Sequence, residues 1–399
     1  MSYLIYQGLI AVLLALNLYL NSFGNFKKFD IIKNTILFIK STILNGLHLQ
    51  YIYSVMQLYN TLSKKERAEL IKRAGDKRLT LSFYKYHLIK NPEIFRNFLF
   101  IELNKIDVLG RIYIANEGIN AQLSLPSKFM TEFKKVLDGI SFLENVRLNI
   151  AIEHDNEAFL KLKIKLRDKI VADGLKDGEY DLNKNGVHVD ADNFNKLLED
   201  KNTITIDMRN HYESEIGHFK GAQLPDVDTF RESLPIIEKK YNSSKEDKNI
   251  LMYCTGGIRC EKASAYLINK GYKNVYQLNG GIIEYARQVK EHNLENKFLG
   301  KNFVFDNRRS ERISGDIISN CHQCGDKCDE HVNCNNEACH LLFIQCESCA
   351  KKYNGCCSIE CSEINSLPLE KQKELRRGKK NSNKIFKKGR FEEKPLNKI

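Results

Sequence analysis

The first part of the chain alternates apolar and polar residues in short runs that are separated by helical patterns. Leu79–Tyr86 alternates and is rich in aromatic residues, which is typical of a strand with one buried face. Further strands are predicted at 110–115, 121–125, 146–152 and 160–166, a turn at 116–120, and helices at 93–103 and 129–137. Strands that flank two helices over this length predict a ferredoxin-like α/β domain, which we place at 61–174.

The second part, 188–295, alternates strands with helices in a regular order. Helices are predicted at 191–199, 234–240, 262–270 and 282–289, and strands at 203–208, 250–254 and 275–278. Pro235 is expected in the first turn of its helix, where a missing N–H is tolerated. This order predicts a doubly wound parallel sheet, joined to the first domain by a polar linker at 175–187. The fold class is therefore α/β.

The loop between the strand 250–254 and the following helix is the strongest chemical signal in the sequence. It consists of Cys254, Thr255, Gly256, Gly257, Ile258, Arg259 and Cys260. Backbone N–H groups converge at such a strand-to-helix turn, so they lower the pKa of a thiol and stabilise an anionic sulfur. We predict a nucleophile or sulfur carrier at Cys254, and the competing interpretation is a buried structural cysteine. Cys260 is either a packing residue or a disulfide partner of Cys254.

Positive charge is concentrated near the C-terminus. The 399 residues carry a formal net charge of +12, and the basic tail 366–399 holds 12 Lys and Arg against 4 Asp and Glu. This excess favours a polyanionic partner, although a solvated tail is the alternative. We predict RNA contacts at Arg376, Arg377, Lys379, Lys380, Lys387 and Lys388. Tyr84, Lys85, Tyr86 and Arg111 form either a second RNA surface or part of the first core.

Ten of the 12 cysteines lie between Cys321 and Cys361, within a cysteine-rich module that we place at 300–365. Their clustering favours a reduced, cytoplasmic chain over dispersed disulfides. The two CxxC pairs have the spacing of zinc ligands, and so small a segment needs a staple to fold, so we expect one or two structural Zn²⁺ ions. An iron–sulfur cluster, free thiols and disulfides are the alternatives, and no flavin or haem signature is visible. The candidate ligands are Cys321, Cys324, Cys328, Cys334, Cys339, Cys346, Cys349, Cys356, Cys357 and Cys361, with unknown pairing.

Residues 1–60 form an extension without a motif. Leu9–Leu20 is apolar but marginal for a membrane span, no Lys or Arg precedes it, and no clean cleavage site follows. Three interpretations compete for residues 1–55: a start that is really at Met56, a membrane anchor, and a signal peptide. Membrane contact is expected only if this segment is translated and retained.

Three elements of the second part resemble the rhodanese family. They are Asp207–Arg209 at a strand end, Gly217–Ala222, and the loop of Cys254. The resemblance implies that Asp207 and Arg209 brace the loop and that Cys254 carries a persulfide. It also favours His218 as a hydrogen-bonded loop histidine rather than a general base.

Further segments resemble the bacterial tRNA uridine hydroxylase family over about 79–390. They are Ser82–Tyr86, Asn116–Ala121, Lys165–Gly174, Met252–Ser264, Gly280–Ala286, Gly300–Asp306 and the run from Cys321 to Cys346. The resemblance implies a cytoplasmic oxidoreductase that uses molecular oxygen to convert the wobble uridine of tRNA to 5-hydroxyuridine. Cys254 would be its catalytic residue, as a thiolate or through a persulfide, and tRNA its partner.

Three other functions compete with this one. The first is a sulfurtransferase that carries a persulfide on Cys254, and the second is a non-catalytic RNA- or protein-binding adaptor. The third is a phosphatase, but four residues separate Cys254 from Arg259, one fewer than in a Cys-x-x-x-x-x-Arg phosphate loop.

Overall fold

The computed structural model of the chain describes residues 60–176 and 178–377. These residues belong to one compact unit. The expectations for Leu9–Leu20 and for most of the basic tail lie outside the described residues. Among the residues that are described, no helix is long and apolar enough to cross a membrane.

The first domain is built on a five-stranded sheet with the order β4-β1-β3-β2-β5. Its strands are β1 Arg78–Tyr86, β2 Leu109–Ala115, β3 Gly118–Pro126, β4 Asn149–Ile150 and β5 Leu162–Leu166, and its helices are α3 Lys64–Ala74, α4 Pro92–Lys105 and α5 Met130–Asp138, with a 3-10 turn at Ser127–Phe129. The first four strands pair antiparallel, whereas β5 runs parallel to β2. The first four strands give the order of the predicted ferredoxin-like fold, and β5 extends it at one edge.

Two predicted boundaries in this domain are wrong. The turn predicted at 116–120 is shorter, because β3 already begins at Gly118. Gly118 has φ +144°, and a Cβ atom there would lie 2.1 Å from the carbonyl oxygen of Lys85, so only glycine lets β3 pair with β1 at this point. The strand predicted at 146–152 shrinks to Asn149–Ile150, because the chain is still turning at Val146, whose N–H donates to the carbonyl of Leu143.

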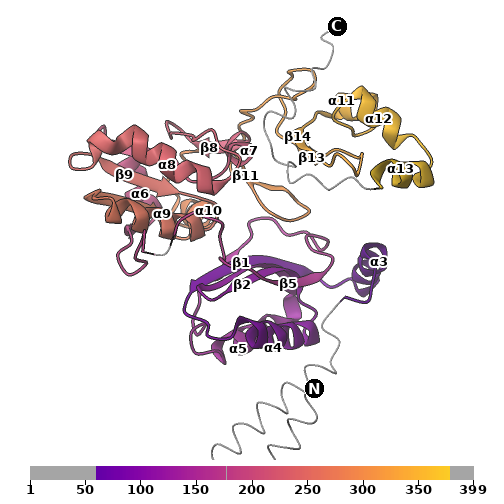
Figure 1. The fold of residues 1–399 in the computed structure, drawn as a ribbon, viewed down its shortest axis with the longest axis horizontal. Coiled ribbons are helices and arrows are strands. Elements are labelled where there is room, and N and C mark those ends of the chain that lie inside the picture. Colours follow the sequence, from indigo (N-terminus) through magenta and orange to yellow (C-terminus); the bar gives the residue numbers. More distant parts are fainter. Residues whose placement is uncertain (1–59, 177, 378–399) are drawn as a thin grey trace, which may run out of the picture. The chain divides into compact units, whose positions relative to one another are not determined.

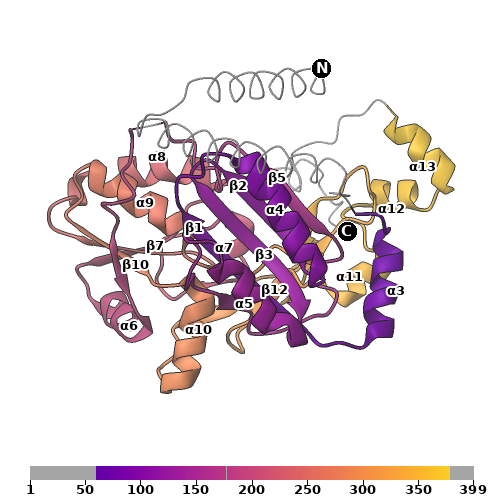
Figure 2. The same cartoon turned by 90° about the horizontal axis from the view of Figure 1, so that it is seen from below.

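Helices α4 and α5 cover one face of this sheet (Figures 1 and 2). On that face Phe83 of β1 packs against Phe133 of α5, with ring centroids 6.3 Å apart. Side chains alternate along a strand, so Tyr84 and Tyr86 project from the opposite face. That opposite face carries the residues that contact the second domain.

The second domain is a parallel sheet with the order β6-β10-β9-β7. Its strands are β6 Val187–Val189, β7 Thr203–Asp207, β9 Asn249–Tyr253 and β10 Asn274–Leu278, and its helices are α6 Ala191–Glu199, α7 His211–Ser214, α8 Phe230–Tyr241, α9 Ile258–Asn269 and α10 Gly281–His292, with a 3-10 turn at Asn242–Ser244. One apolar core joins the sheet to α8 and α9, and a second joins it to α6 and α10. The predicted doubly wound α/β architecture is confirmed.

Two helices of this domain begin earlier than predicted. Helix α8 begins at Phe230, where Thr229 and Glu232 form a capping box, so Pro235 lies inside the helix and not in its first turn. Helix α9 begins at Ile258, because Gly257 ends the loop with φ +103°. Arg259 and Cys260 are therefore already helical.

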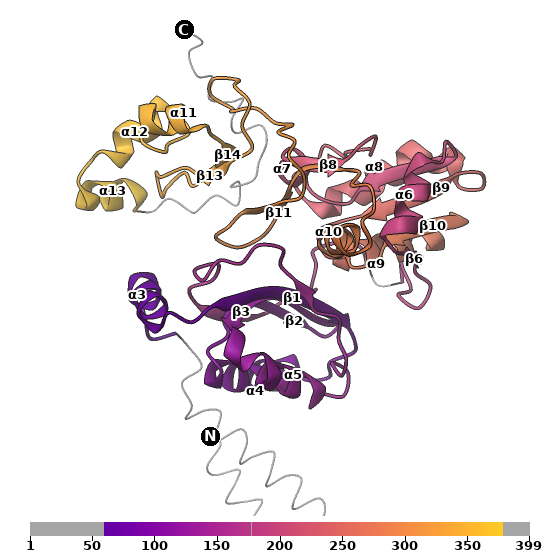
Figure 3. The same cartoon turned by 180° about the vertical axis from the view of Figure 1, so that it is seen from behind.

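The C-terminal part begins with β11 Phe298–Phe303, which pairs antiparallel with β8 Gly217–Phe219 and with β12 Ser310–Arg312. It continues as a ribbon of β13 His331–Asn333 and β14 Leu342–Ile344, and then as helices α11 Glu347–Lys352, α12 Ile359–Asn365 and α13 Leu369–Arg376. Helices α11 and α12 lie beside this ribbon (Figures 1 and 3). Cysteines make up most of the buried cluster here, which also contains Leu341 and Phe343.

Candidate active site at the Cys254 loop

Cys254 lies directly after β9, at the carboxyl end of a central strand of the parallel sheet. Its side chain is fully buried, and the backbone N–H of Gly257 donates to its Sγ at 3.2 Å. A Cβ atom on Gly257 would lie 2.8 Å from the Tyr84 hydroxyl, so both the backbone conformation and the lack of space require glycine here. Thr255 and Gly256 complete the turn before α9.

The surroundings of Cys254 favour its thiolate. Burial raises the pKa of the Cys254 thiol, but a hydrogen bond from the Cys260 thiol, the charge of Arg259 and the backbone N–H groups of Arg259 and Cys260 lower it, to about 6. Burial and the neighbouring Cys254 raise the pKa of Cys260 well above its ordinary value. Cys260 therefore stays protonated and donates to the sulfur of Cys254.

The Arg259 guanidinium donates its strongest hydrogen bonds to Glu213 and not to the sulfur of Cys254. Its guanidinium donates to both carboxylate oxygens of Glu213, at 2.6 and 2.8 Å, and both side chains are buried. Arg259 thus stabilises the Cys254 thiolate through its charge and is held in place by Glu213. An arginine committed in this way is not available to clasp a phosphate, which argues against the phosphatase interpretation.

Asp207 and Arg209 lie under the loop as a second buried ion pair. The Arg209 guanidinium donates to Asp207 at 2.6 Å and to the carbonyl of Gly217 at 2.6 Å. The backbone N–H of Met208, between them, donates to the carbonyl of Tyr253 at 2.9 Å. His218 is hydrogen-bonded to the carbonyl of Ser214 at 2.8 Å. These contacts fit supporting roles.

The start of α10 holds the loop from a third side. Backbone N–H groups of Ile282 and Ile283 donate to the carbonyls of Cys254 and Thr255, at 3.0 and 3.3 Å. A Cβ atom on Gly281 would lie 2.6 Å from both of those carbonyl oxygens, so glycine is required for this close approach. This explains the Gly-Gly-Ile run of the sequence.

The first domain contacts the same loop and helix. The Tyr84 hydroxyl donates to Glu261 at 3.0 Å, and the Tyr86 hydroxyl donates to the carbonyl of Ile258 at 3.1 Å. The Asn149 amide donates to the carbonyl of Gly256 at 3.3 Å. Tyr84 and Tyr86, predicted as an RNA surface or a core, are thus neighbours of the Cys254 loop and of α9.

A buried charge cluster also joins the two domains. Lys262 of α9 donates to both carboxylate oxygens of Glu117, at 2.9 and 2.7 Å, and also to Asp173. Lys169 donates to the other oxygen of Asp173 at 2.8 Å. The side chains of Lys262 and Asp173 are fully buried. Glu117, Asp173 and Lys262 thus come from three separate segments of the sequence and meet in one cluster of charges.

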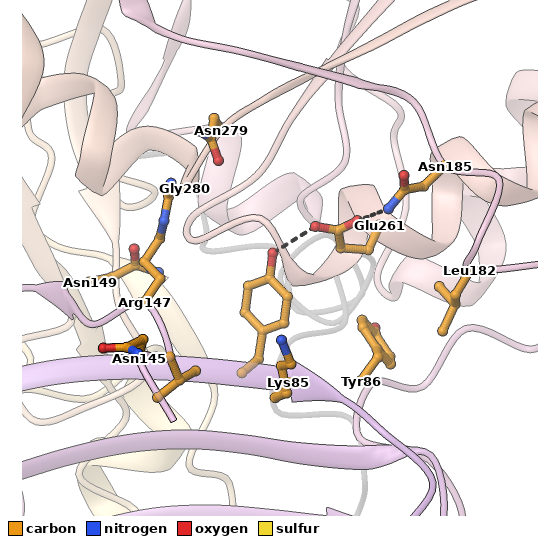
Figure 4. A pocket seen from close by; sticks show the side chains of 12 residues that line it. Lys85, Tyr86, Asn145, Arg147, Asn149, Leu182, Asn185, Glu261, Asn279 and Gly280 are labelled. Carbon is orange, nitrogen blue, oxygen red and sulfur yellow. Dashed lines mark hydrogen bonds between the residues drawn. The ribbon is translucent and has the colours of Figure 1, made fainter. Parts of the chain in front are cut away.

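A cavity of about 320 Å³ lies where the first domain faces α9 and the start of α10. Figure 4 shows Tyr86 of β1, Arg147, and Asn185 with Glu261 around it, the last two joined by a hydrogen bond. Its full lining is Tyr84, Lys85, Tyr86, Asn145, Val146, Arg147, Asn149, Leu182, Asn185, Glu261, Asn279 and Gly280. Most of these side chains are polar, so the cavity suits a polar ligand.

The cysteine-rich module brings eight of its ten cysteines into two groups of four. One group is Cys321, Cys324, Cys346 and Cys349, and the other is Cys334, Cys339, Cys357 and Cys361. Within each group the sulfur atoms lie within 4.8 Å of one another, as the ligands of one tetrahedral ion would. Cys328 and Cys356 belong to neither group, and none of the 12 cysteines, all of which are described, forms a disulfide. Both groups therefore offer a set of four thiols suited to a metal.

The basic candidates are only partly described. Arg376 ends α13 and forms an ion pair with Glu337, and Arg377 follows as an exposed residue. Lys379, Lys380, Lys387 and Lys388 lie outside the described residues. The structure thus gives Arg376 an internal partner.

Several neighbours of Cys254 were not predicted. Glu213, Glu261 and Asn149 carry no local signal of such a position in the sequence. Asn149 follows an irregular turn, and Glu261 sits in an ordinary helical pattern. Glu213 and Glu261 lie in the second domain, on α7 and α9, whereas Asn149 reaches the loop only through the packing of the first domain against it.

Three family models match successive parts of the chain. A UPF0176 acylphosphatase like domain matches residues 78–170, a rhodanese-like domain matches 190–288, and a Rhodanase C-terminal model matches 299–362. These matches follow the order of the ferredoxin-like domain, the doubly wound domain and the cysteine-rich part.

Curated relatives match most of the chain. A tRNA uridine(34) hydroxylase of Leptospira interrogans is 53% identical over 334 residues, which cover 84% of this chain and 91% of the relative. Proteins with the same name from Pectobacterium carotovorum and Yersinia pestis are 52% and 50% identical over the same share of this chain and cover 94% of each relative.

Proposed function

The chain belongs to the tRNA uridine(34) hydroxylase family, and we propose that it hydroxylates C5 of uridine 34 in tRNA with Cys254 as the catalytic residue. One observation carries the proposal: in a chain so similar to these relatives, the surroundings of Cys254 favour its thiolate. Cys254 lies at the carboxyl end of a central strand of the parallel sheet, where α/β folds place their active sites, and its neighbour Cys260 stays protonated.

The reaction consumes molecular oxygen and a reductant. The C5–H bond of the uracil breaks and a C5–O bond forms, with one oxygen atom from dioxygen. The second oxygen atom leaves as water, and a cellular reductant supplies two electrons and two protons. The net change replaces hydrogen by hydroxyl at C5.

We infer that Cys254 acts as a nucleophile on the ring. Addition of its thiolate to C6 makes C5 electron-rich, so that C5 becomes the position that reacts with oxygen. Loss of the C5 proton and of the thiolate then restores the C5–C6 double bond. A persulfide on Cys254 would act in the same way through its outer sulfur. A thiolate at neutral pH is what a pKa of about 6 provides.

The two groups of four cysteines are proposed to hold structural zinc ions. Four thiolates around one point are a preferred zinc set, and such short strands and helices bury too little apolar surface to fold alone. Zinc here would fix the ribbon β13–β14 against α11 and α12. It would lie in a separate part of the chain from the Cys254 loop.

We also propose that tRNA is bound in the cytoplasm with the help of the basic tail. Positive charges of Lys and Arg contact phosphates without regard to sequence, so they suit the body of a tRNA. Cysteines gathered in sets suited to a metal, as in the two groups here, are usual in cytoplasmic proteins.

Isotope labelling tests the reaction. Cells that rely on this protein for 5-hydroxyuridine are grown under isotopically heavy dioxygen, and their tRNA nucleosides are weighed by mass spectrometry. The proposal requires the heavy oxygen in the 5-hydroxyl group. Oxygen derived from water would overturn it. A thiosulfate-to-cyanide sulfur-transfer assay on the purified protein then measures the competing sulfurtransferase activity, which should be weak.

A further inference from the structure

We propose that the cavity between the first domain and α9 receives the target nucleotide, and that Asn149 reads the N3–H of its uracil. This inference rests on the proposed function, since it names where the substrate of that reaction sits. The cavity, at about 320 Å³, falls in the range of small-molecule sites and suits one nucleotide turned out of its strand.

Two cations at the cavity fit the phosphates of a nucleotide. Within residues 60–176 and 178–377, neither Lys85 nor Arg147 forms a hydrogen bond or an ion pair through its side chain, and both are exposed. Arg147 lies near Glu284, but that carboxylate is held by Arg287 and Gln288. The two positive charges are therefore available to an anionic ligand.

The carboxylate in the cavity does not offset this preference. Glu261 accepts hydrogen bonds from Tyr84 at 3.0 Å and Asn185 at 2.6 Å, and pairs with His188 at 2.9 Å. Its oxygens are thus occupied by groups of the protein. The phosphate of a nucleotide can therefore approach, because the positive charges of Lys85 and Arg147 are not paired with a carboxylate of the described residues.

Asn149 supplies the observation that points to uracil. Its side chain is buried, and its Nδ2 donates to the carbonyl of Gly256, whereas its Oδ1 has no hydrogen-bond partner. A buried acceptor without a donor is costly, so a ligand donor is expected there. Uracil carries an N–H at N3, whereas cytosine presents an acceptor at the same position. Asn149 therefore favours uridine over cytidine.

The cavity adjoins the reactive loop. Tyr84 lines the cavity, and its hydroxyl lies against Gly257, which donates to the sulfur of Cys254. Asn149 likewise contacts Gly256. Because Cys254 is fully buried, the base reaches the sulfur only when side chains around the loop move aside. Tyr84 and Asn149 each line the cavity and touch this loop.

RNA binding by the full-length protein tests the phosphate contacts. The probe is an unmodified anticodon stem-loop with uridine at position 34, titrated at several salt concentrations. The double variant Lys85→Ala/Arg147→Ala should bind at least tenfold more weakly and lose about two units of salt slope, about one per phosphate contact. The matched control is Lys134→Ala/Lys135→Ala, which removes two exposed charges from α5 on the opposite face of the same sheet. Equal binding by the two variants would overturn the inference.

The role of Asn149 is tested with the same stem-loop carrying uridine or cytidine at position 34. Wild type should prefer uridine at least tenfold, and Asn149→Ala should lose that preference. An unchanged preference in Asn149→Ala would overturn the assignment. If wild type formed no 5-hydroxyuridine in cells yet showed these binding differences, the proposed reaction would fail while the cavity remained a uridine site.

Discussion

Arg259 and Glu213 form a buried ion pair with two hydrogen bonds, at N–O distances of 2.6 and 2.8 Å, beneath the Cys254 loop. The pair joins the first turn of α9 to α7, and it fixes a positive charge close to Cys254. The arginine at the end of the loop therefore acts on the sulfur at a distance, while its hydrogen bonds serve the fold.

Removing the charge of Glu213 should destabilise the protein strongly. Glu213→Gln leaves the buried Arg259 without its counter-ion, and such a loss costs about 3–5 kcal/mol. The free energy of unfolding, measured by chemical denaturation, should fall by that amount. Glu291→Gln is the control, because it breaks an exposed Arg–Glu pair on α10 and should cost less than about 1 kcal/mol. Similar losses in the two variants would contradict this account of Arg259.

The Cys254 thiol should ionise far below an ordinary cysteine. The difference in thiolate absorbance between wild type and Cys254→Ser should increase with pH, with an apparent pKa of about 6. Cys260→Ala removes the thiol that donates to Cys254, so the same difference should rise at a higher pH. A Cys254 pKa near 9, or one unmoved by Cys260→Ala, would show that this environment is wrong.

The same ionisation predicts how stability depends on pH. The folded-state pKa of Cys254, about 6, lies below its ordinary value of 9.0, so folding favours the thiolate. The resulting stabilisation is fully present above about pH 9 and is lost as the pH falls through 6. The stability advantage of wild type over Cys254→Ser, followed by denaturation, should therefore grow from pH 6 to pH 9. An advantage that shrinks with rising pH would contradict the assignment.

Zinc content should follow the two cysteine groups. Elemental analysis of the purified protein should find about two zinc ions per chain, one for each group. Cys321→Ser and Cys334→Ser should each remove about one of them. Cys328→Ser is the matched control, since that buried cysteine belongs to neither group, and it should leave the zinc content unchanged. This grouping would be refuted if Cys328→Ser lost zinc while Cys321→Ser and Cys334→Ser kept both ions.

The charge cluster at Lys262 should hold the two domains together. Lys262→Met leaves Glu117 and Asp173 without their shared cation, and we expect a loss of about 3–5 kcal/mol in unfolding free energy. Lys270→Met is the control, because Lys270 directly follows the last residue of α9. Its partner Glu238 lies 3.8 Å away, and both side chains are partly exposed. A cost for Lys262→Met no larger than for Lys270→Met would mean that the cluster contributes little.

Local sequence patterns predicted the elements but not their partners. The strand, glycines and helix around Cys254 are neighbours in sequence, so the reactive loop was recognisable. Glu213 lies 46 residues from Arg259, and Tyr84 lies 177 residues from Glu261. The first contact depends on how α7 packs against α9, and the second on how the two domains pack, and residue spacing encodes neither.

The cysteine groups show the same limit in another form. The CxxC spacing identified Cys321 with Cys324 and Cys346 with Cys349, and these two pairs form one group. The second group has no CxxC pair, because the ribbon β13–β14 and α12 bring its members together. Spacing alone therefore left Cys328 and Cys356 among the candidates.

The most direct test measures 5-hydroxyuridine at position 34 of tRNA by mass spectrometry. The cells lack their own hydroxylation activity at this position and are complemented with wild type, Cys254→Ala or Cys260→Ala, all checked for equal protein levels. The account predicts that wild type restores the nucleoside, that Cys254→Ala does not, and that Cys260→Ala restores less of it. Full restoration by Cys254→Ala would contradict the central claim that this cysteine carries the reaction.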